Sequence, residues 1–281
     1  MSISTATPMP TLGEARLGPL PDVTLGRRAL PRVAISFPVR LQLAGLPCPL
    51  DARARDLSVG GVGVETPTRF ALRDLRRVTL LPPGGRIDLA AEGCWQTEAP
   101  GEGAFLAGIR FLELDGGALG RLWDLVHEQT KTLTCWLARQ QTFEALSLSD
   151  IMDFVHLTRL REVPAGARVY RQGEAAKGED SIFVVMRGEV VLETRTPRQR
   201  KLFVARAQPG QMLGGAALVV GVVPAETAIV EREATLLEIS RGAFENLKQT
   251  NPGLAFQISA IAMHSHLMHQ ETALVRAVDD H

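Results

Sequence analysis

The chain has 281 residues, of which 45% are hydrophobic and 22% charged, a balance that excludes a chain disordered throughout. Its 31 Lys and Arg residues equal its 31 Asp and Glu residues, so no global field attracts it to nucleic acid or to an anionic membrane. No apolar run reaches the ~18 residues that cross a bilayer, and the first twenty residues lack a signal-peptide pattern. We therefore expect a cytoplasmic protein of two domains without membrane insertion.

The first half of the chain has the pattern of a small β-rich domain. Residues 1–24 are rich in Ser, Thr, Pro and Gly and are expected to form a flexible N-terminal segment. From Val33 onward, five or so short β-type runs separated by turn signals predict an antiparallel barrel or sandwich. Apolar residues then recur every three or four positions from Leu119 to Leu137, which predicts an amphipathic helix and a domain of residues 25–140.

The second domain, expected over residues 141–281, begins with helical spacing that Ser147 or Ser149 caps. Short apolar runs then return between about residues 159 and 240, and glycines at 166, 173, 188 and 210 stand at their joints, where turns need a permissive backbone. Helical patterns resume near Ala243 and continue from Pro252 to about Val278. The second domain is therefore also predicted to be β-rich with flanking helices.

Positive charge is concentrated near the start of the first domain. Residues 21–60 contain six Arg and three Asp, and the densest part includes Arg27, Arg28 and Arg32. Planar guanidinium groups bind phosphate through two parallel hydrogen bonds and lie flat on purine rings. This segment is therefore a candidate nucleotide clamp; the alternative is a solvated basic loop.

A polar turn follows the arginines, with Asp56, Ser58, Gly60 and Gly61 close together. The carboxylate of Asp56 can accept hydrogen bonds from the N1–H and N2–H₂ groups of guanine, and Gly61 lets a ligand approach the main chain. An ordinary Asx-type turn is the alternative.

The spacing Arg28-x-x-x-Arg32, followed by Asp56-x-Ser58-x-x-Gly61, resembles the PilZ-domain family, as does the later run Gly108-Ile109-Arg110-Phe111. The resemblance implies a six-stranded antiparallel β-barrel that binds cyclic di-GMP. It implies that Arg28 and Arg32 hold phosphates and guanine faces, while the turn at residues 56–61 lines the guanine pocket. Arg27, directly before the motif, implies a preference for a stacked pair of ligand molecules.

Residues 143–262 resemble the cyclic nucleotide-monophosphate binding domain, a β-roll with flanking helices. The resemblance rests on Val163–Gly166, Gln172–Glu174, Arg187-Gly188, Pro209-Gly210 and Thr235–Ile239. That family implies a phosphate-binding cassette with a Glu for the ribose and an Arg for the phosphate.

The cassette of this chain departs from that pattern. After Gly214, Gly215 stands where the Glu belongs, and Glu226 precedes Thr227 where the Arg belongs. No Arg or Lys occurs between Ala207 and Val230. Losing the cationic partner of a buried phosphate costs about 3–5 kcal/mol. We therefore expect a degenerate cassette that serves dimerisation or partner docking; binding of another ligand is the alternative.

Other constellations do not predict a catalytic or metal site. The spacing of His264, His266 and His269 does not give the i, i+4 geometry of zinc helices, which favours a solvated or interface helix face. Cys48, Cys94 and Cys135 lie far apart, and no catalytic serine or Walker motif occurs. We expect no enzymatic activity, no metal and no cofactor. The short stretch after Thr250 leads us to expect no DNA-binding domain.

The sequence thus predicts a bacterial-type cyclic di-GMP receptor for signal transduction, with an output such as motility or biofilm regulation. Ligand capture is expected to change its conformation or its binding to an unidentified protein partner, and a homodimer is one option. The alternatives are a dual-input sensor with a second nucleotide in the β-roll, and a scaffold or oligomerisation adaptor that binds neither.

Overall fold

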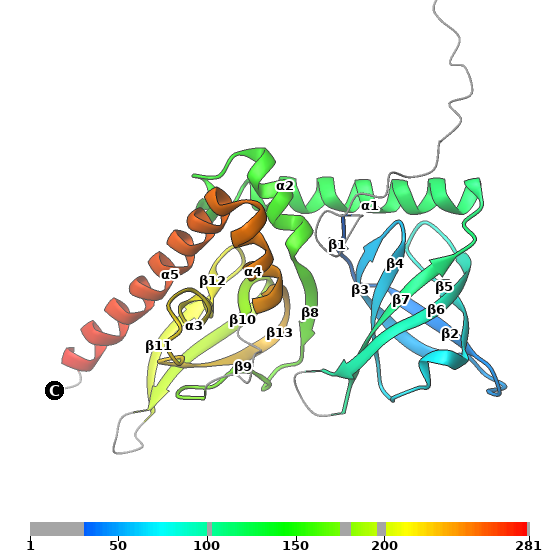
Figure 1. Cartoon of the computed structure of the whole chain (residues 1–281). Coiled ribbons are helices and arrows are strands. Elements are labelled where there is room, and N and C mark those ends of the chain that lie inside the picture. The colour runs from blue at the N-terminus through cyan, green and yellow to red at the C-terminus, as the bar shows by residue number, and fades with distance from the viewer. Residues whose placement is uncertain (1–30, 100–102, 175–180, 196–200, 280–281) are drawn as a thin grey trace, which may run out of the picture.

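The computed structural model describes residues 31–99, 103–174, 181–195 and 201–279. It consists of two β-rich units that lie side by side, and a long helix, α1 (Gly116–Leu137), runs across the barrel toward the second unit (Figure 1). The N-terminal segment of residues 1–24 and the arginines Arg27 and Arg28 fall outside the described residues. No helix in the described ranges is long and apolar enough to cross a membrane.

The first unit is a closed antiparallel barrel of six strands, which confirms the predicted fold. Its strands are β2 (Pro38–Leu43), β3 (Leu50–Ser58), β4 (Gly61–Thr66), β5 (Leu75–Leu80), β6 (Ile87–Glu98) and β7 (Phe105–Leu112). They pair in the order β3-β2-β5-β6-β7-β4, and the β3–β4 pairing closes the barrel. A two-residue strand, β1 (Val33–Ala34), pairs with β3 at Leu57 and Asp56, and a short 3-10 helix (Leu72–Asp74) precedes β5.

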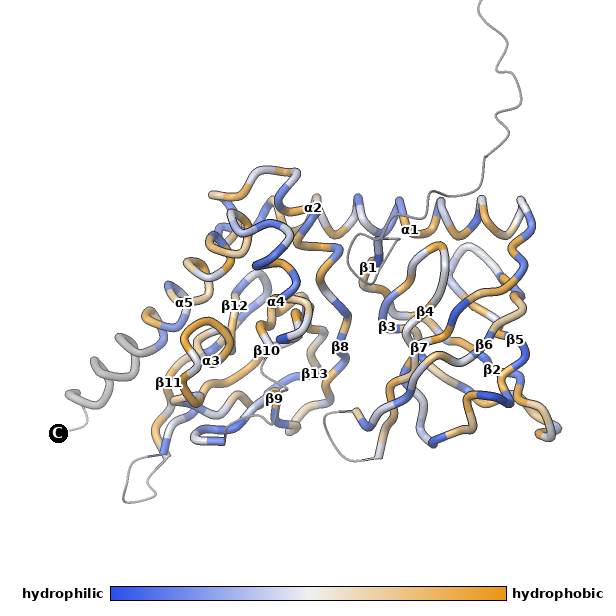
Figure 2. Tube along the Cα trace, in the orientation of Figure 1, coloured by the Kyte–Doolittle hydropathy of each residue, from blue (hydrophilic) through white to orange (hydrophobic). Residues whose placement is uncertain are grey.

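Alternation of side chains explains why these segments form a barrel. In β2, Val39, Leu41 and Leu43 are buried, whereas the residues between them are exposed. Successive side chains of a strand point to opposite faces, so an alternating sequence buries one face and solvates the other. The same alternation is visible as changing hydropathy along the strands in Figure 2.

Helix α1 links the two units. Asp115 caps its N-terminus by accepting a hydrogen bond from the amide of Ala118 at 2.7 Å. Its buried stripe, spaced three and four residues apart as the sequence predicts, consists of Ala118, Leu122, Val126, Thr130, Leu133 and Leu137. This stripe belongs to one continuous apolar core that includes barrel residues and the helices of the second unit.

Two short helical segments connect α1 to the second sheet. A 3-10 turn (Gln141–Phe143) buries Phe143, whose ring meets that of Phe154 edge to face at a centroid distance of 5.2 Å. Helix α2 (Leu148–Leu157) follows, and Ser147 caps it by accepting from the amide of Asp150 at 3.1 Å. Ser147, one of the two predicted caps, is therefore the one used.

The second unit is a β-roll with helices, as predicted. Its strands are β8 (Arg159–Val163), β9 (Arg168–Tyr170), β10 (Ser181–Arg195), β11 (Lys201–Ala207), β12 (Met212–Leu213) and β13 (Thr227–Ser240). The main order is β11-β10-β13-β8, with β12 on β10 and β9 on β13. The helices are α3 (Gly215–Val220), α4 (Arg241–Thr250) and α5 (Pro252–Asp279).

The four glycines expected at strand joints all have positive φ angles, between +72° and +90°. One of them, Gly188, lies within β10 and not at its end. A β-carbon at Gly188 would lie 2.3 Å from the carbonyl oxygen of Glu233, so this close approach of β10 to β13 requires glycine.

The buried stripe of α1 generates a stability prediction. Leu122→Ala removes a fully buried side chain from the core that joins α1 to the barrel, so we expect a loss of about 2–5 kcal/mol in the free energy of unfolding. Trp123→Ala is the matched control, because that neighbouring side chain is 58% exposed and should matter far less. Urea unfolding of both variants measures the difference, and equal losses would contradict the assignment of the two helix faces.

Candidate functional site

The described residues of the predicted nucleotide site come together at one end of β3. Arg32 immediately precedes β1, and Asp56 and Ser58 lie in the last three residues of β3. The Nη1 atom of Arg32 donates a hydrogen bond to Oδ1 of Asp56, a residue 24 positions further along the chain. The sequence motif thus becomes a contact because β1 pairs with β3 beside Asp56.

A β-bulge determines where Asp56 points. Ala54 pairs with Val64, but Asp56 pairs with Gly63, so Arg55 is an extra residue in β3. Bulges of this kind redirect side chains and occur often beside functional sites. Because a β-carbon on Gly63 would lie 2.5 Å from Oδ2 of Asp56, the missing side chain at Gly63 leaves room for the carboxylate.

The turn after Asp56 is held by internal contacts. The hydroxyl of Ser58 is buried and donates to the carbonyl oxygen of Gly61 at 3.3 Å, and the carbonyl oxygen of Gly60 accepts from the amide of Phe111 at 3.0 Å. A β-carbon on Gly61 would lie 2.4 Å from the carbonyl oxygen of Ile109. Ser58, Gly60 and Gly61 therefore shape the turn and attach it to β7, in addition to any contact with a ligand.

Asp56 is buried and contacts two guanidinium groups. Only 4% of its side chain is exposed, and its Oδ2 atom lies 3.4 Å from Nε of Arg159, the first residue of β8 in the roll. The side chains of Arg32 and Arg159 are 24% and 27% exposed. A buried carboxylate needs such partners, because removing a charge from water costs several kcal/mol unless it is paired.

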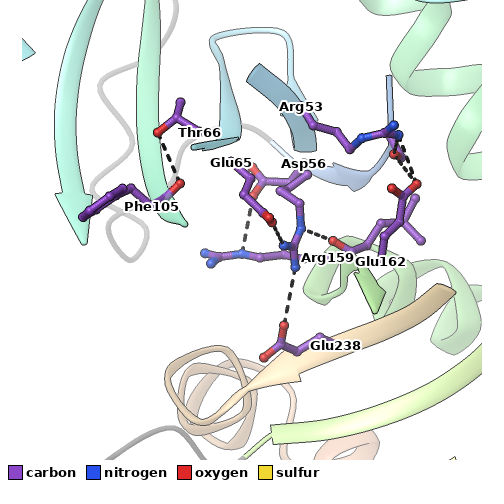
Figure 3. A network of polar contacts seen from close by, with 11 residues as sticks. Arg53, Asp56, Glu65, Thr66, Phe105, Arg159, Glu162 and Glu238 are labelled. Carbon is purple, nitrogen blue, oxygen red and sulfur yellow. Dashed lines mark hydrogen bonds and ion pairs between the residues drawn. The ribbon is translucent and has the colours of Figure 1, made fainter. Parts of the chain in front are cut away.

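Arg55 also connects the barrel to the roll. Its guanidinium binds the carboxylate of Glu65 in the barrel and the carbonyl oxygen of Leu160 in β8, and its Nη2 atom lies 3.8 Å from Glu238 of β13. Only 11% of its side chain is exposed. Arg55 is therefore more buried than Arg159, whose side chain is 27% exposed. Figure 3 shows Glu65 and Glu238, the partners of Arg55, from nearby.

The rim of this contact is more exposed. Nη1 of Arg53 lies 3.1 Å from Oε1 of Glu162 in β8 and 2.9 Å from the hydroxyl of Ser36, which itself donates to Glu162 at 2.8 Å (Figure 3). The side chains of Arg53 and Glu162 are 50% and 39% exposed, so solvent screens this pair strongly.

A cleft of about 440 Å³ opens between the barrel and the roll at this point. Its size lies within the range of small-molecule sites. Four arginines line it, one from the barrel and three from the roll, together with Asp56 and Gly63; the arginines are Arg55, Arg159, Arg161 and Arg168. Sequence analysis missed the three roll arginines because only the tertiary arrangement brings them to the PilZ-like motif.

The cassette of the roll is filled by its own side chains. Gly214 has a φ angle of +85°, and a β-carbon there would lie 3.3 Å from the ring of Tyr170. A β-carbon on Gly215, which begins α3, would lie 2.4 Å from that of Ala262 in α5. Gly215 therefore permits the close packing of α3 against α5. The hydroxyl of Thr227 accepts a hydrogen bond from the amide of Gln172 at 3.0 Å, so it fixes the start of β13.

Glu226 places a buried carboxylate in this cassette. The hydroxyl of Tyr170 donates to its Oε1 atom at 3.2 Å, and Nδ1 of His266 in α5 lies 3.9 Å away. Burial raises the pKa of Glu226, and burial next to this carboxylate raises the pKa of Tyr170 well above its usual value. The interpretation of the α5 histidines as a solvated or interface face is wrong for His266, whose side chain is only 20% exposed and faces Glu226.

Comparison with known families agrees with this architecture. The PilZ domain family matches residues 26–128, and the cyclic nucleotide-binding domain family matches residues 160–251. The chain is therefore a PilZ domain followed by a cyclic nucleotide-binding domain, two kinds of ligand-binding regulatory domain.

Individual proteins also resemble this chain. The chain is 27% identical over 199 residues to a cyclic nucleotide-gated potassium channel of Mesorhizobium japonicum, an alignment that covers 71% of this chain and 47% of the channel. A cyclic nucleotide-binding domain from Methylobacillus flagellatus is 13% identical over 55% of this chain and 85% of its own, with a TM-score of 0.46. The regulatory domain of protein kinase A from Toxoplasma gondii, solved with cAMP, is 16% identical over 66% and 73%, with a TM-score of 0.45.

The packing of Gly63 against Asp56 generates a prediction about the site. Gly63→Ala forces the new methyl group against the buried carboxylate, so we expect a loss of about 1–3 kcal/mol in the free energy of unfolding. The control is Gly84→Ala, because a β-carbon there has no neighbour within 4 Å. Denaturant unfolding compares the two, and a neutral Gly63→Ala would show that Asp56 does not need this space.

Proposed function

We propose that this chain is a non-enzymatic cyclic di-GMP receptor in which Asp56 and Arg32 bind the ligand. The contact between Arg32 and Asp56 is the observation that carries the proposal, because it brings the two halves of the PilZ motif to one place beside a cleft of ligand size. The match of the PilZ domain family to residues 26–128 supports the same assignment.

The chemistry of the two side chains fits the two parts of a guanine dinucleotide. The two oxygens of Asp56 accept the N1–H and N2–H₂ groups of a guanine edge. The guanidinium of Arg32, released from Asp56, binds a ligand phosphate or the O6 and N7 atoms of guanine. Arg28, the other arginine of the motif, is proposed for the same role from its sequence position alone and lies outside the described residues.

We propose a different role for the cyclic nucleotide-binding domain, namely docking and transmission of the signal. Its cassette holds the buried carboxylate of Glu226, and the ring of Tyr170 packs against the cassette glycine Gly214. A phosphate brought to this place would meet a carboxylate where its binding requires a cation. The relation to a cyclic nucleotide-gated channel is the observation in favour of the alternative, a dual-input sensor.

Isothermal titration of the full chain with cyclic di-GMP tests the receptor proposal. We expect saturable binding that Asp56→Ala and Arg32→Ala each weaken by about 30-fold or more, because each variant removes a charged partner of the ligand. The matched controls are Arg86→Ala and Asp88→Ala, since these residues form an exposed ion pair elsewhere on the same barrel. Absence of binding, or equal affinity in all four variants, would overturn the proposal.

Titration with cAMP and with cGMP tests the role of the second domain. We expect affinities no tighter than millimolar for both nucleotides, because Glu226 repels their phosphate. Glu226→Gln removes this repulsion while keeping the shape of the side chain, and provides the comparison. Micromolar binding of either nucleotide to the unmodified chain would favour the dual-input sensor.

A further inference from the structure

We propose that Arg159 of the roll competes with cyclic di-GMP for Asp56, so that ligand capture releases the contact between the two domains at this point. The inference rests on the proposed function and adds to it the means by which the second domain responds to the ligand. It starts from the position of Arg159, which is outside the PilZ motif and 3.4 Å from the motif carboxylate (Figure 3).

The backbone of Arg159 is held firmly at the start of β8. The preceding residue, Thr158, is buried, and both its amide and its hydroxyl donate to the carbonyl oxygen of Val155 at the end of α2. In the strand pairing of β8 with β13, the backbone of Arg159 lies opposite that of Glu238. Its side chain is therefore presented to Asp56 from a fixed position, and any displacement from Asp56 must move either this side chain or the whole start of β8.

Both oxygens of the Asp56 carboxylate already face a guanidinium group, and the side chain is buried among these partners. Oδ1 is bound by Arg32 and Oδ2 faces Arg159, while only 4% of the side chain is exposed. A guanine edge that donates N1–H and N2–H₂ to one carboxylate needs both of these oxygens. Arg32 gains a ligand phosphate in exchange, as proposed above, whereas Arg159 loses its ion pair. Because Asp56 is buried, a guanine edge reaches Oδ2 only by taking the place of Arg159, and we propose that the two compete for this atom.

The same segment of the second unit also touches Arg32. Nδ1 of His156, in the last turn of α2, lies 2.9 Å from the carbonyl oxygen of Arg32. His156 and Arg159 thus bracket the α2–β8 junction, and each contacts one of the two residues that we assign to the ligand. Any rearrangement of Arg32 and Asp56 on binding reaches the second domain through this junction.

Two other sets of polar contacts between the described parts of the units do not involve the motif side chains. The pair of Arg53 and Glu162 lies at the exposed rim, and Arg55 binds Leu160 and Glu238 in the interior. These contacts can persist when the ligand is bound. The release that we propose is therefore local to residues 156–159, with the rest of the interface acting as a hinge.

Thermodynamic linkage makes the proposal testable by affinity. A contact that exists only without ligand lowers the apparent affinity, and its removal raises that affinity by the same factor. Because Arg159 is 27% exposed and solvent screens part of this ion pair, we expect Arg159→Ala to tighten the binding of cyclic di-GMP to the full chain by about three- to tenfold in calorimetry. Arg159→Gln keeps most of the side chain and should also tighten the binding of cyclic di-GMP. It replaces the alanine variant in this test if that variant folds poorly.

Arg53→Ala is the matched control, because it also removes an arginine between the two units without touching Asp56. The affinity of Arg53→Ala for cyclic di-GMP should equal that of the unmodified chain. Hydrogen exchange provides a second measurement: cyclic di-GMP should speed exchange of the amides of residues 156–159 in the unmodified chain, and in Arg159→Ala these amides should exchange fast already without ligand.

Each outcome decides between the proposals. Weaker binding by Arg159→Ala would make Arg159 a ligand contact and overturn the competition, as would unchanged affinity. An equal gain in Arg53→Ala would attribute the effect to general loosening of the interface and likewise overturn it. Binding that is insensitive to Asp56→Ala would overturn the proposed ligand site itself, and a complete absence of binding by the unmodified chain would overturn both proposals.

Discussion

The polar contact between the two domains is built around the buried carboxylate of Asp56. Removed from water, this group requires cationic partners, and it takes one from the segment before the barrel and one from the roll, Arg32 and Arg159. The bulge at Arg55 and the missing side chain at Gly63 give it the space in which to lie. A single negative charge thus connects three parts of the chain that are distant in sequence, and a change in its partners affects all three.

The two candidate ligand sites differ in the sign of their charged side chains. The cleft beside the barrel collects arginines, whereas the cassette of the roll contains a carboxylate, Glu226, bound by the hydroxyl of Tyr170 and close to His266 of α5. The close approach of Gly215 to Ala262 packs α3 directly against α5. The residues of the cassette therefore pack against α5 and hold it in position. In our proposal, the nucleotide binds at the barrel instead.

Local sequence patterns were sufficient to predict most of the fold. The alternation in β2, the three- and four-residue spacing in α1 and the cap at Ser147 depend on neighbours in the sequence, and the structure contains all three. The candidate pair Arg32 and Asp56 was predictable from its motif spacing. Arg159 was not, because nothing in its own neighbourhood marks it, and its role depends on how the roll lies against β3. The role of Gly63, which leaves space for the Asp56 carboxylate, was equally unpredictable. It depends on the strand register, which the bulge at Arg55 shifts by one residue.

The unbroken apolar core beneath α1 has a consequence for how the chain can be divided. Leu133, Leu137 and Phe143 pack in the same cluster as barrel residues such as Leu80 and roll residues such as Ile239. Cleavage of the chain near residue 140 would expose hydrophobic surface on both fragments, and we expect both to aggregate. The two domains thus share one hydrophobic interior, and we expect the chain to unfold as a single cooperative unit.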